Sequence, residues 1–156
     1  MSTSLTSIDF TNFRVPKLRT LQNAFYKSSS LKSVNLSSVE TDDLRNLGET
    51  FYDCHSIEYI YLPKNNYKNG VLMSGAFTNC YSLKSIDLSS YSGRISSEKA
   101  FKGCTNLSNI DISSFDTAPQ DLFKDLPKTG EIKLNKRAFN DIKDQIPEDW
   151  TIILIK

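Results

Sequence analysis

One pattern of residues recurs along almost the whole chain, at intervals of 22 to 26 residues. A phenylalanine is followed by a small residue three positions later, by Leu or Ile six positions later, and by apolar residues nine and eleven positions later. Units of this length cannot bury their apolar faces alone, so stacked copies are predicted to form a solenoid. The copies start at Phe25, Phe51, Phe77, Phe101 and the degenerate Phe123, and Leu5, Ile8 and Phe10 supply the back half of one more unit.

The apolar positions within each unit predict how it folds. The I-x-L segment alternates, so its apolar residues point to one face of a short strand, and stacked copies give a parallel sheet over a continuous core. Return segments such as 42–52 and 96–101 are predicted to be a helical turn or a short helix that ends at the phenylalanine. The period and the L-x-x-I-x-L pattern lie in the leucine-rich-repeat range. We therefore predict an α/β leucine-rich-repeat solenoid of about five and a half units over residues 1–135, with a short-stranded parallel sheet on one face and short helical turns or loops on the other.

A different pattern follows Leu134 and predicts a cap over residues 136–156. An amphipathic helix of about ten residues is expected, with Asn135 as its N-cap and Pro147 as its stop. Trp150 and a strand-like segment follow, and we expect this helix and strand to shield the last repeat edge. Apolar residues at helical spacing carry the prediction, and they are Phe139, Ile142 and Ile146.

The N-terminal end offers no comparable cap, because residues 5–10 already have the strand pattern. An exposed first strand is an edge that invites pairing. We therefore expect either a longer natural chain or assembly with a partner through this end.

Composition excludes several function classes. Nineteen Lys and Arg against 18 Asp and Glu give a formal net charge of +1, which disfavours a nucleic-acid binder. The apolar run 152–155 is far shorter than the roughly 20 residues of a membrane span. The N-terminus lacks the charged start and apolar stretch of a signal peptide. Three cysteines and one histidine leave little for metal or redox chemistry, so we predict no cofactor and no enzyme.

Three cysteines occupy one repeat position, the place that Ser28 takes in the first copy. We predict a column of reduced, buried thiols. Disulfides between neighbours suit coils about 5 Å apart, but one cysteine would stay unpaired and the Cβ vectors would run parallel. A metal site would need His or carboxylates at ligand spacing, and none recurs there. His55 adjoins the first cysteine, but adjacent residues usually point apart, so we predict a surface histidine rather than a catalytic dyad. The cysteines are Cys54, Cys80 and Cys104.

Several phrases of the sequence resemble the repeats of BspA-like leucine-rich-repeat surface proteins. They are Ser-Ile-Asp-Leu-Ser-Ser at 85–90, Asn-Ile-Asp-Ile-Ser-Ser-Phe-Asp at 109–116, Gly-Ala-Phe-Thr-Asn-Cys at 75–80 and Lys-Ala-Phe-Lys-Gly-Cys at 99–104. The resemblance implies a curved solenoid with a role in cell-surface adhesion or host interaction, on the cell surface or secreted, without implying one ligand. The chain departs from the family's pattern at Ser28, at 61–63 and in lacking an export signal.

The outward-facing strand positions carry most of the functional signal. Most of them are small and polar, but Tyr59 and Tyr61 place two aromatic rings on one unit, and such rings among polar neighbours are typical of binding surfaces. Asp87 and Asp111 should be neighbours on adjacent strands, where they could bind a cation, contact a partner or be solvated. Tyr67, in the turn-rich insertion 63–70, could extend the same surface.

These observations favour a non-enzymatic interaction module that resembles BspA-like adhesins. It would bind a partner protein or glycan through the open strand face, without nucleic acid and without membrane insertion. The alternative is a structural or receptor-binding component of a larger assembly, such as a phage virion. The uncapped N-terminal end and the missing signal peptide favour that alternative.

Overall fold

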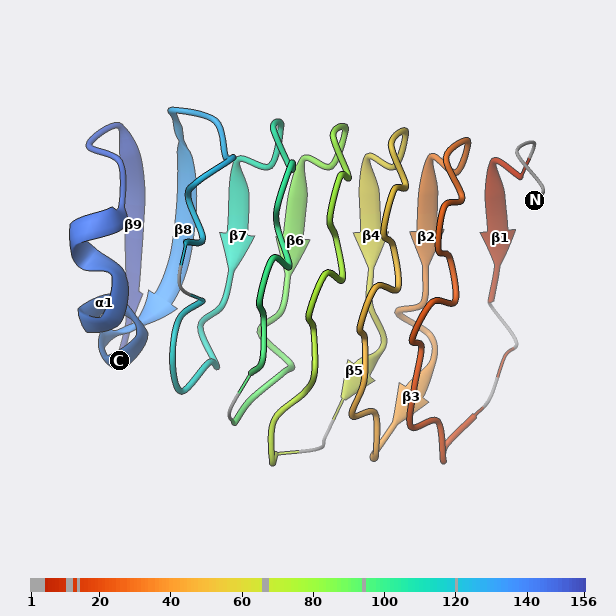
Figure 1. Cartoon of the computed structure of the whole chain (residues 1–156). Helices are drawn as coiled ribbons and strands as arrows, with labels where there is room; N and C mark the ends of the chain where they lie inside the picture. The colour runs from red at the N-terminus through yellow and green to blue at the C-terminus, as the bar shows by residue number, and fades with distance from the viewer. Residues whose placement is uncertain (1–4, 11–12, 14, 66–67, 94, 120) are drawn as a thin grey trace.

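The computed structural model describes the chain apart from residues 1–4, 11–12, 14, 66–67, 94 and 120. The chain winds into a stack of coils, with its two termini at opposite ends of the stack (Figure 1). One strand from each coil joins a parallel sheet in the order β1-β2-β4-β6-β7-β8-β9, and β3 pairs with β5 in a second, two-stranded sheet. The predicted leucine-rich-repeat solenoid is thus confirmed. The strands are β1 (Ser7–Asp9), β2 (Ser33–Asn35), β3 (Glu40–Thr41), β4 (Tyr59–Tyr61), β5 (Lys64–Asn65), β6 (Ser85–Asp87), β7 (Asn109–Asp111), β8 (Gly130–Asn135) and β9 (Trp150–Ile155).

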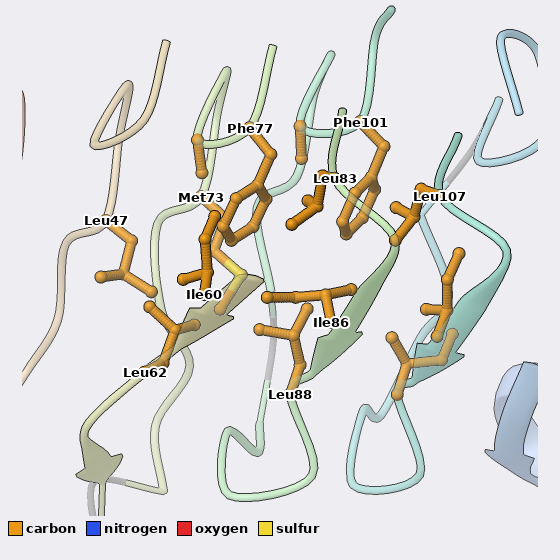
Figure 2. Packing of buried hydrophobic residues seen from close by; sticks show 14 of the residues in the cluster. Leu47, Ile60, Leu62, Met73, Phe77, Leu83, Ile86, Leu88, Phe101 and Leu107 are labelled. Atoms are coloured by element: carbon orange, nitrogen blue, oxygen red, sulfur yellow. The ribbon is translucent and has the colours of Figure 1, made fainter. Parts of the chain in front are cut away.

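The core lies between the sheet and a column of phenylalanines. The middle residue of each inner strand is buried, as Ile60, Ile86 and Ile110 show. Figure 2 shows Phe77 and Phe101 on the far side of the core from Ile86. The rings of the first four repeat phenylalanines stack nearly parallel, at centroid distances of 5.0, 5.9 and 5.5 Å. We name each coil by its phenylalanine, from the Phe25 coil to the Phe123 coil.

The return segments are turns and loops, one of the forms predicted for this face, and the short helix expected for segments such as 42–52 and 96–101 does not form there. The return segments of the Phe25, Phe51, Phe77 and Phe101 coils each hold two residues with positive φ, placed four residues apart, which breaks any helical run. In the Phe51 coil they are Glu49 and Asp53, at φ values of 51° and 59°. Gly75 and Gly103 occupy equivalent places, where glycine adopts positive φ without strain.

These turns direct alternate backbone amides toward the next coil and so build a ladder along the back of the solenoid. In the Phe25 coil, the amides of residues 21, 23, 25 and 27 donate to the carbonyls of residues 46, 48, 50 and 52. The Phe51 coil repeats the pattern from 47, 49, 51 and 53 to 72, 74, 76 and 78. The Phe77 coil repeats it from 73, 75, 77 and 79 to 96, 98, 100 and 102. Each of these three junctions therefore has four rungs, which satisfy backbone groups that would otherwise be buried unpaired.

The C-terminal cap begins as predicted. Helix α1 (Lys136–Ile142) is N-capped by Asn135, whose side chain accepts a 2.9 Å hydrogen bond from the Ala138 amide, and the 3-10 helix η1 (Lys143–Gln145) follows. Trp150 is buried against Phe123 and donates its indole N–H to the Pro127 carbonyl at 3.0 Å. Phe123 thereby leaves the phenylalanine column.

The final strand differs from the predicted shield in one respect. Strand β9 does cover β8, with which it pairs over six residues, but it exposes apolar side chains of its own. Ile152 and Leu154 are 41% and 52% exposed, although they continue the buried columns of Ile132 and Leu134. At the opposite edge, β1 pairs with β2, and the nearby Phe13 is 51% exposed. Both edges of the sheet therefore carry exposed apolar residues.

Candidate functional site

Tyr59 and Tyr61 lie on the open face of the sheet, as predicted. Because successive strand residues point to opposite faces, the buried Ile60 between them sends both tyrosines outward. They are 40% and 53% exposed. Strand register places Tyr59 between Ser33 and Ser85 of the adjacent strands. The two rings are therefore flanked by small polar side chains, and their part in binding stays a prediction.

Position 61 does not need the turn-forming acceptor found in other coils, because residue 63 is a proline. In neighbouring coils an Asn or Asp at this position accepts a hydrogen bond from the amide two residues later, which ends the strand in a tight turn. Pro63 has no amide proton, so its coil needs no such acceptor. In the other coils, the Ser37 amide donates to the Asn35 side chain at 3.0 Å, the Ser89 amide to Asp87 at 2.8 Å, and the Ser113 amide to Asp111 at 2.9 Å.

A charged pair lies beside Tyr59. The Lys84 ammonium group is 5.2 Å from the centre of the Tyr59 ring and 3.4 Å from its hydroxyl group, and it also pairs with the Glu58 carboxylate. The hydrogen bond from Lys84 lowers the pKa of Glu58, and the same bond raises the pKa of Lys84. The two groups therefore carry opposite charges at neutral pH, and they leave no net charge beside the ring.

Asp87 and Asp111 are direct neighbours across β6 and β7, as predicted. The second oxygen of Asp111 pairs with Lys133 at 2.9 Å. Burial raises the pKa of Asp111, but the hydrogen bonds from Ser113 and the pairing with Lys133 outweigh it and hold the pKa below its ordinary value. Each aspartate thus accepts a hydrogen bond from the serine amide of its own turn, a role that the Asp-x-Ser spacing could have shown. Tyr67, the remaining residue of the predicted surface, lies outside the described residues.

The described part of the chain contains no group of three or more His, Cys, Asp or Glu side chains that could hold a metal ion. A cation bound at Asp87 and Asp111, one of the alternatives for this pair, would therefore have only these two carboxylates as ligands among the described residues. Since Asp111 is already paired with Lys133, the geometry favours the turn-forming role for both.

The repeat pattern and its coil geometry agree with one known family of sequences. The family described as BspA type leucine-rich repeat region matches the chain in six copies, over residues 1–71 and 46–151. The chain belongs to the BspA-type leucine-rich-repeat family. Membership supports a repeat protein-interaction module, and such repeats are typically non-enzymatic. No curated protein matches the chain.

The cysteines of this BspA-type chain form the predicted buried column. Each thiol donates to the carbonyl of the preceding coil's phenylalanine, at 3.0 to 3.2 Å, and all three cysteines are free. Burial raises the pKa of Cys54 to about 11 and that of Cys104 to about 12, and it raises the pKa of Cys80 well above its ordinary value. His55 is exposed and stacks on Tyr81 at 4.9 Å, which confirms a surface histidine.

Sequence reasoning missed a second set of aromatic side chains in the BspA-type coils, on the turns rather than on the sheet. Tyr26 and Tyr52 follow successive repeat phenylalanines and stack at 5.1 Å. His55 and Tyr81 stack in the same way three residues further along each turn. Comparing the residues after each phenylalanine, column by column, would have revealed both pairs.

Within the described ranges, no helix has the length and apolar character needed to span a membrane.

Proposed function

We propose that this BspA-type chain is an adhesin-like module that binds a partner protein or a glycan through its open strand face. The contact surface is the tyrosine surface, which we define as Tyr59, Tyr61 and the adjoining Lys84–Glu58 pair. One observation carries the proposal: two tyrosines are 40% and 53% exposed on a face where the other strands present mainly small polar residues.

The chemistry of the tyrosine surface suits either kind of partner. A tyrosine ring offers a flat apolar face and a hydroxyl group, so it can pack on an apolar side chain or on the C–H face of a sugar while it makes a hydrogen bond. Its two χ angles mean that little conformational entropy is lost on binding. The neighbouring Lys84–Glu58 pair adds one donor and one acceptor of opposite charge at the rim.

The test replaces the two tyrosines by residues that neighbouring coils already carry at the same positions, Tyr59→Ser and Tyr61→Asn. A ligand is first obtained by screening the wild-type chain on an array of glycans and immobilised extracellular proteins. Interface tyrosines often contribute about 2 kcal/mol or more, so the double variant should bind more than tenfold more weakly.

Tyr81→Thr is the matched control, because Tyr81 is 42% exposed but lies on a turn, and the next coil carries Thr105 at that position. It should leave the affinity unchanged. Circular dichroism checks that all variants are folded. Unchanged affinity in a folded double variant would reject the tyrosine surface as the contact site.

The second candidate function is that of a structural or receptor-binding component of a larger assembly, such as a phage virion. The observation that favours it is the exposure of Ile152 and Leu154 on β9, together with Phe13 at the opposite end of the stack. In such an assembly, the end coils of the chain would pack against the end coils of other subunits, and the sheet face would not be the binding site.

A further inference from the structure

The back-side ladder stops between the Phe101 and Phe123 coils. By the spacing of the earlier junctions, the amides of Ser97 and Phe101 should donate to the carbonyls of Ala118 and Leu122. Neither bond forms, and these two amides have no acceptor, nor these two carbonyls a donor, among the described residues. One further rung would fall on residue 120, outside the described residues.

The fourth rung has been replaced by a side chain. The Gly103 amide should reach the Lys124 carbonyl, but it donates instead to the Asp125 carboxylate at 3.1 Å. The phenylalanine column ends at the same junction, because Phe123 packs on Trp150. In front, however, β7 and β8 still pair at three positions. The two coils therefore separate only at the back, where Figure 1 shows a wider space between their traces than between those of the preceding coils.

A cleft of about 750 Å³ fills this space. Its volume lies within the range of roughly 300–1,000 Å³ that is typical of ligand sites. Ser97 and Phe101 line one wall, and Ala118 and Leu122 line the other. Unpaired backbone donors thus face unpaired backbone acceptors across a cleft with an apolar component.

We propose that this cleft binds a peptide segment of a partner protein, which enters between the two coils in the turn-rich backbone conformation of the segments that form the ladder elsewhere. Carbonyls of the peptide would accept hydrogen bonds from the Ser97 and Phe101 amides. Amides of the peptide would donate to the Ala118 and Leu122 carbonyls. A segment in that conformation serves both walls at once, as the Phe77 coil does when its amides donate to one neighbour and its carbonyls accept from the other. Addition of a peptide through main-chain hydrogen bonds is a known mode of peptide recognition.

The charges of the cleft agree with a main-chain ligand. Three lysines line it together with four carboxylates, so no single sign dominates and a strongly charged ligand gains little. Two of the carboxylates already accept backbone amides, Asp125 from Gly103 and Asp141 from Ala118. The side chains of Ile95, Phe101 and Leu122 can take up an apolar side chain of the peptide. This site is separate from the tyrosine surface, so either proposal can fail without the other.

The experiment uses a capped synthetic peptide with the sequence of residues 71–78 as the probe. Within the Phe77 coil this segment donates to the next coil through residues 73, 75 and 77, and accepts from the preceding coil through residues 72, 74, 76 and 78. It therefore carries the hydrogen-bonding pattern that the cleft lacks. The control peptide has the same sequence with the amides of residues 73, 75 and 77 N-methylated, which removes the donors and keeps the side chains.

Amide hydrogen exchange, followed by NMR on the intact chain, locates the peptide. In the free chain, the Ser97 and Phe101 amides should exchange faster than the Phe51 and Phe77 amides. The peptide should slow exchange at Ser97 and Phe101 at least tenfold, and the N-methylated peptide should bind about tenfold more weakly. Equal protection of all four amides in the free chain would overturn the proposal. So would the absence of binding, equal binding of the two peptides, or protection confined to β1 or β9.

Discussion

Pro63 shows how one residue changes what its neighbours can be. Without an amide proton at position 63, the turn after β4 needs no acceptor at position 61, and the side chain there is available for other contacts. The same proline remains useful to the core, because its carbonyl accepts a 2.8 Å hydrogen bond from the buried Tyr91 hydroxyl group. Tyr61 and Pro63 should therefore be energetically coupled as a pair.

A double-mutant cycle with Tyr61→Asp and Pro63→Ser tests this coupling. Tyr61→Asp alone gains no turn hydrogen bond, whereas the two changes together restore the Asp-x-Ser turn of the neighbouring coils. We expect a favourable coupling of about 1 kcal/mol in the free energy of unfolding, the usual net value of a hydrogen bond. Urea unfolding of the four chains measures it. Strictly additive effects would contradict the expected coupling.

The cysteine column should be inert in the folded chain. Cys54 and Cys104 have pKa values of about 11 and 12, so very little of either thiol is ionised at pH 8, and burial blocks the reagent as well. We expect slow reaction of all three cysteines with a thiol reagent until denaturant is added. The chain in urea is the control, since all three should then react at the rate of free cysteine. Rapid native-state reaction of all three would contradict this expectation.

Among the structural elements, the phenylalanine column should contribute strongly to stability. Phe77 is fully buried between Phe51 and Phe101. Phe77→Ala should therefore lower the free energy of unfolding by about 3–5 kcal/mol. Phe123 is half-buried and lies outside the column, so Phe123→Ala is the matched control and should cost less. Equal losses of the two variants in urea unfolding would contradict a larger contribution from the phenylalanines in the column.

The C-terminal cap is the second element with a measurable role. Removing residues 136–156 exposes one edge of β8 and takes away the Trp150 ring, which packs so closely that a Cβ on Gly130 would lie 2.8 Å from it. Because repeat arrays need covered ends, we expect the truncated chain to aggregate or unfold. Size-exclusion chromatography and thermal melting provide the measurement. A monomeric truncated chain with an unchanged Tm would show that β8 needs no cover.

At the scale of the whole molecule, the two ends of the stack should attract each other. Ile152 and Leu154 extend core columns that stop in solvent, and a parallel sheet can continue through its edges into another copy. We expect association that increases with concentration in sedimentation velocity, and that weakens with Ile152→Lys and Leu154→Lys. Leu72→Lys, in the middle of the stack, is the control for adding charge at an exposed leucine. A wild-type chain that stays monomeric at every concentration would reject end-to-end assembly.

The sequence predicts the solenoid well because its signals are local and repeated. The alternation around Ile60 gives both the strand and the outward direction of Tyr59 and Tyr61, and Asn135 marks the start of α1. The choice between helical turns and loops could not be made from the sequence, because positive φ at non-glycine residues such as Glu49 has no strong sequence signal. The cleft between the Phe101 and Phe123 coils could not be predicted from the sequence. At this junction Phe123 packs on Trp150 instead of continuing the phenylalanine column, and this is a tertiary contact without a local sequence signal.

The uneven ladder also gives the solenoid a mechanical weak point. Three junctions are fastened by strand pairs in front and four rungs behind, so they resist bending in both directions. The Phe101–Phe123 junction keeps its strand pair and the Gly93–Phe115 bridge, but at its back, among the described residues, only the Asp125 carboxylate spans the coils. Tension applied along the stack would concentrate its strain there and widen the cleft. This BspA-type chain, stretched between two surfaces, would thus behave as a stiff rod with one compliant joint, and a peptide inserted at that joint would stiffen it.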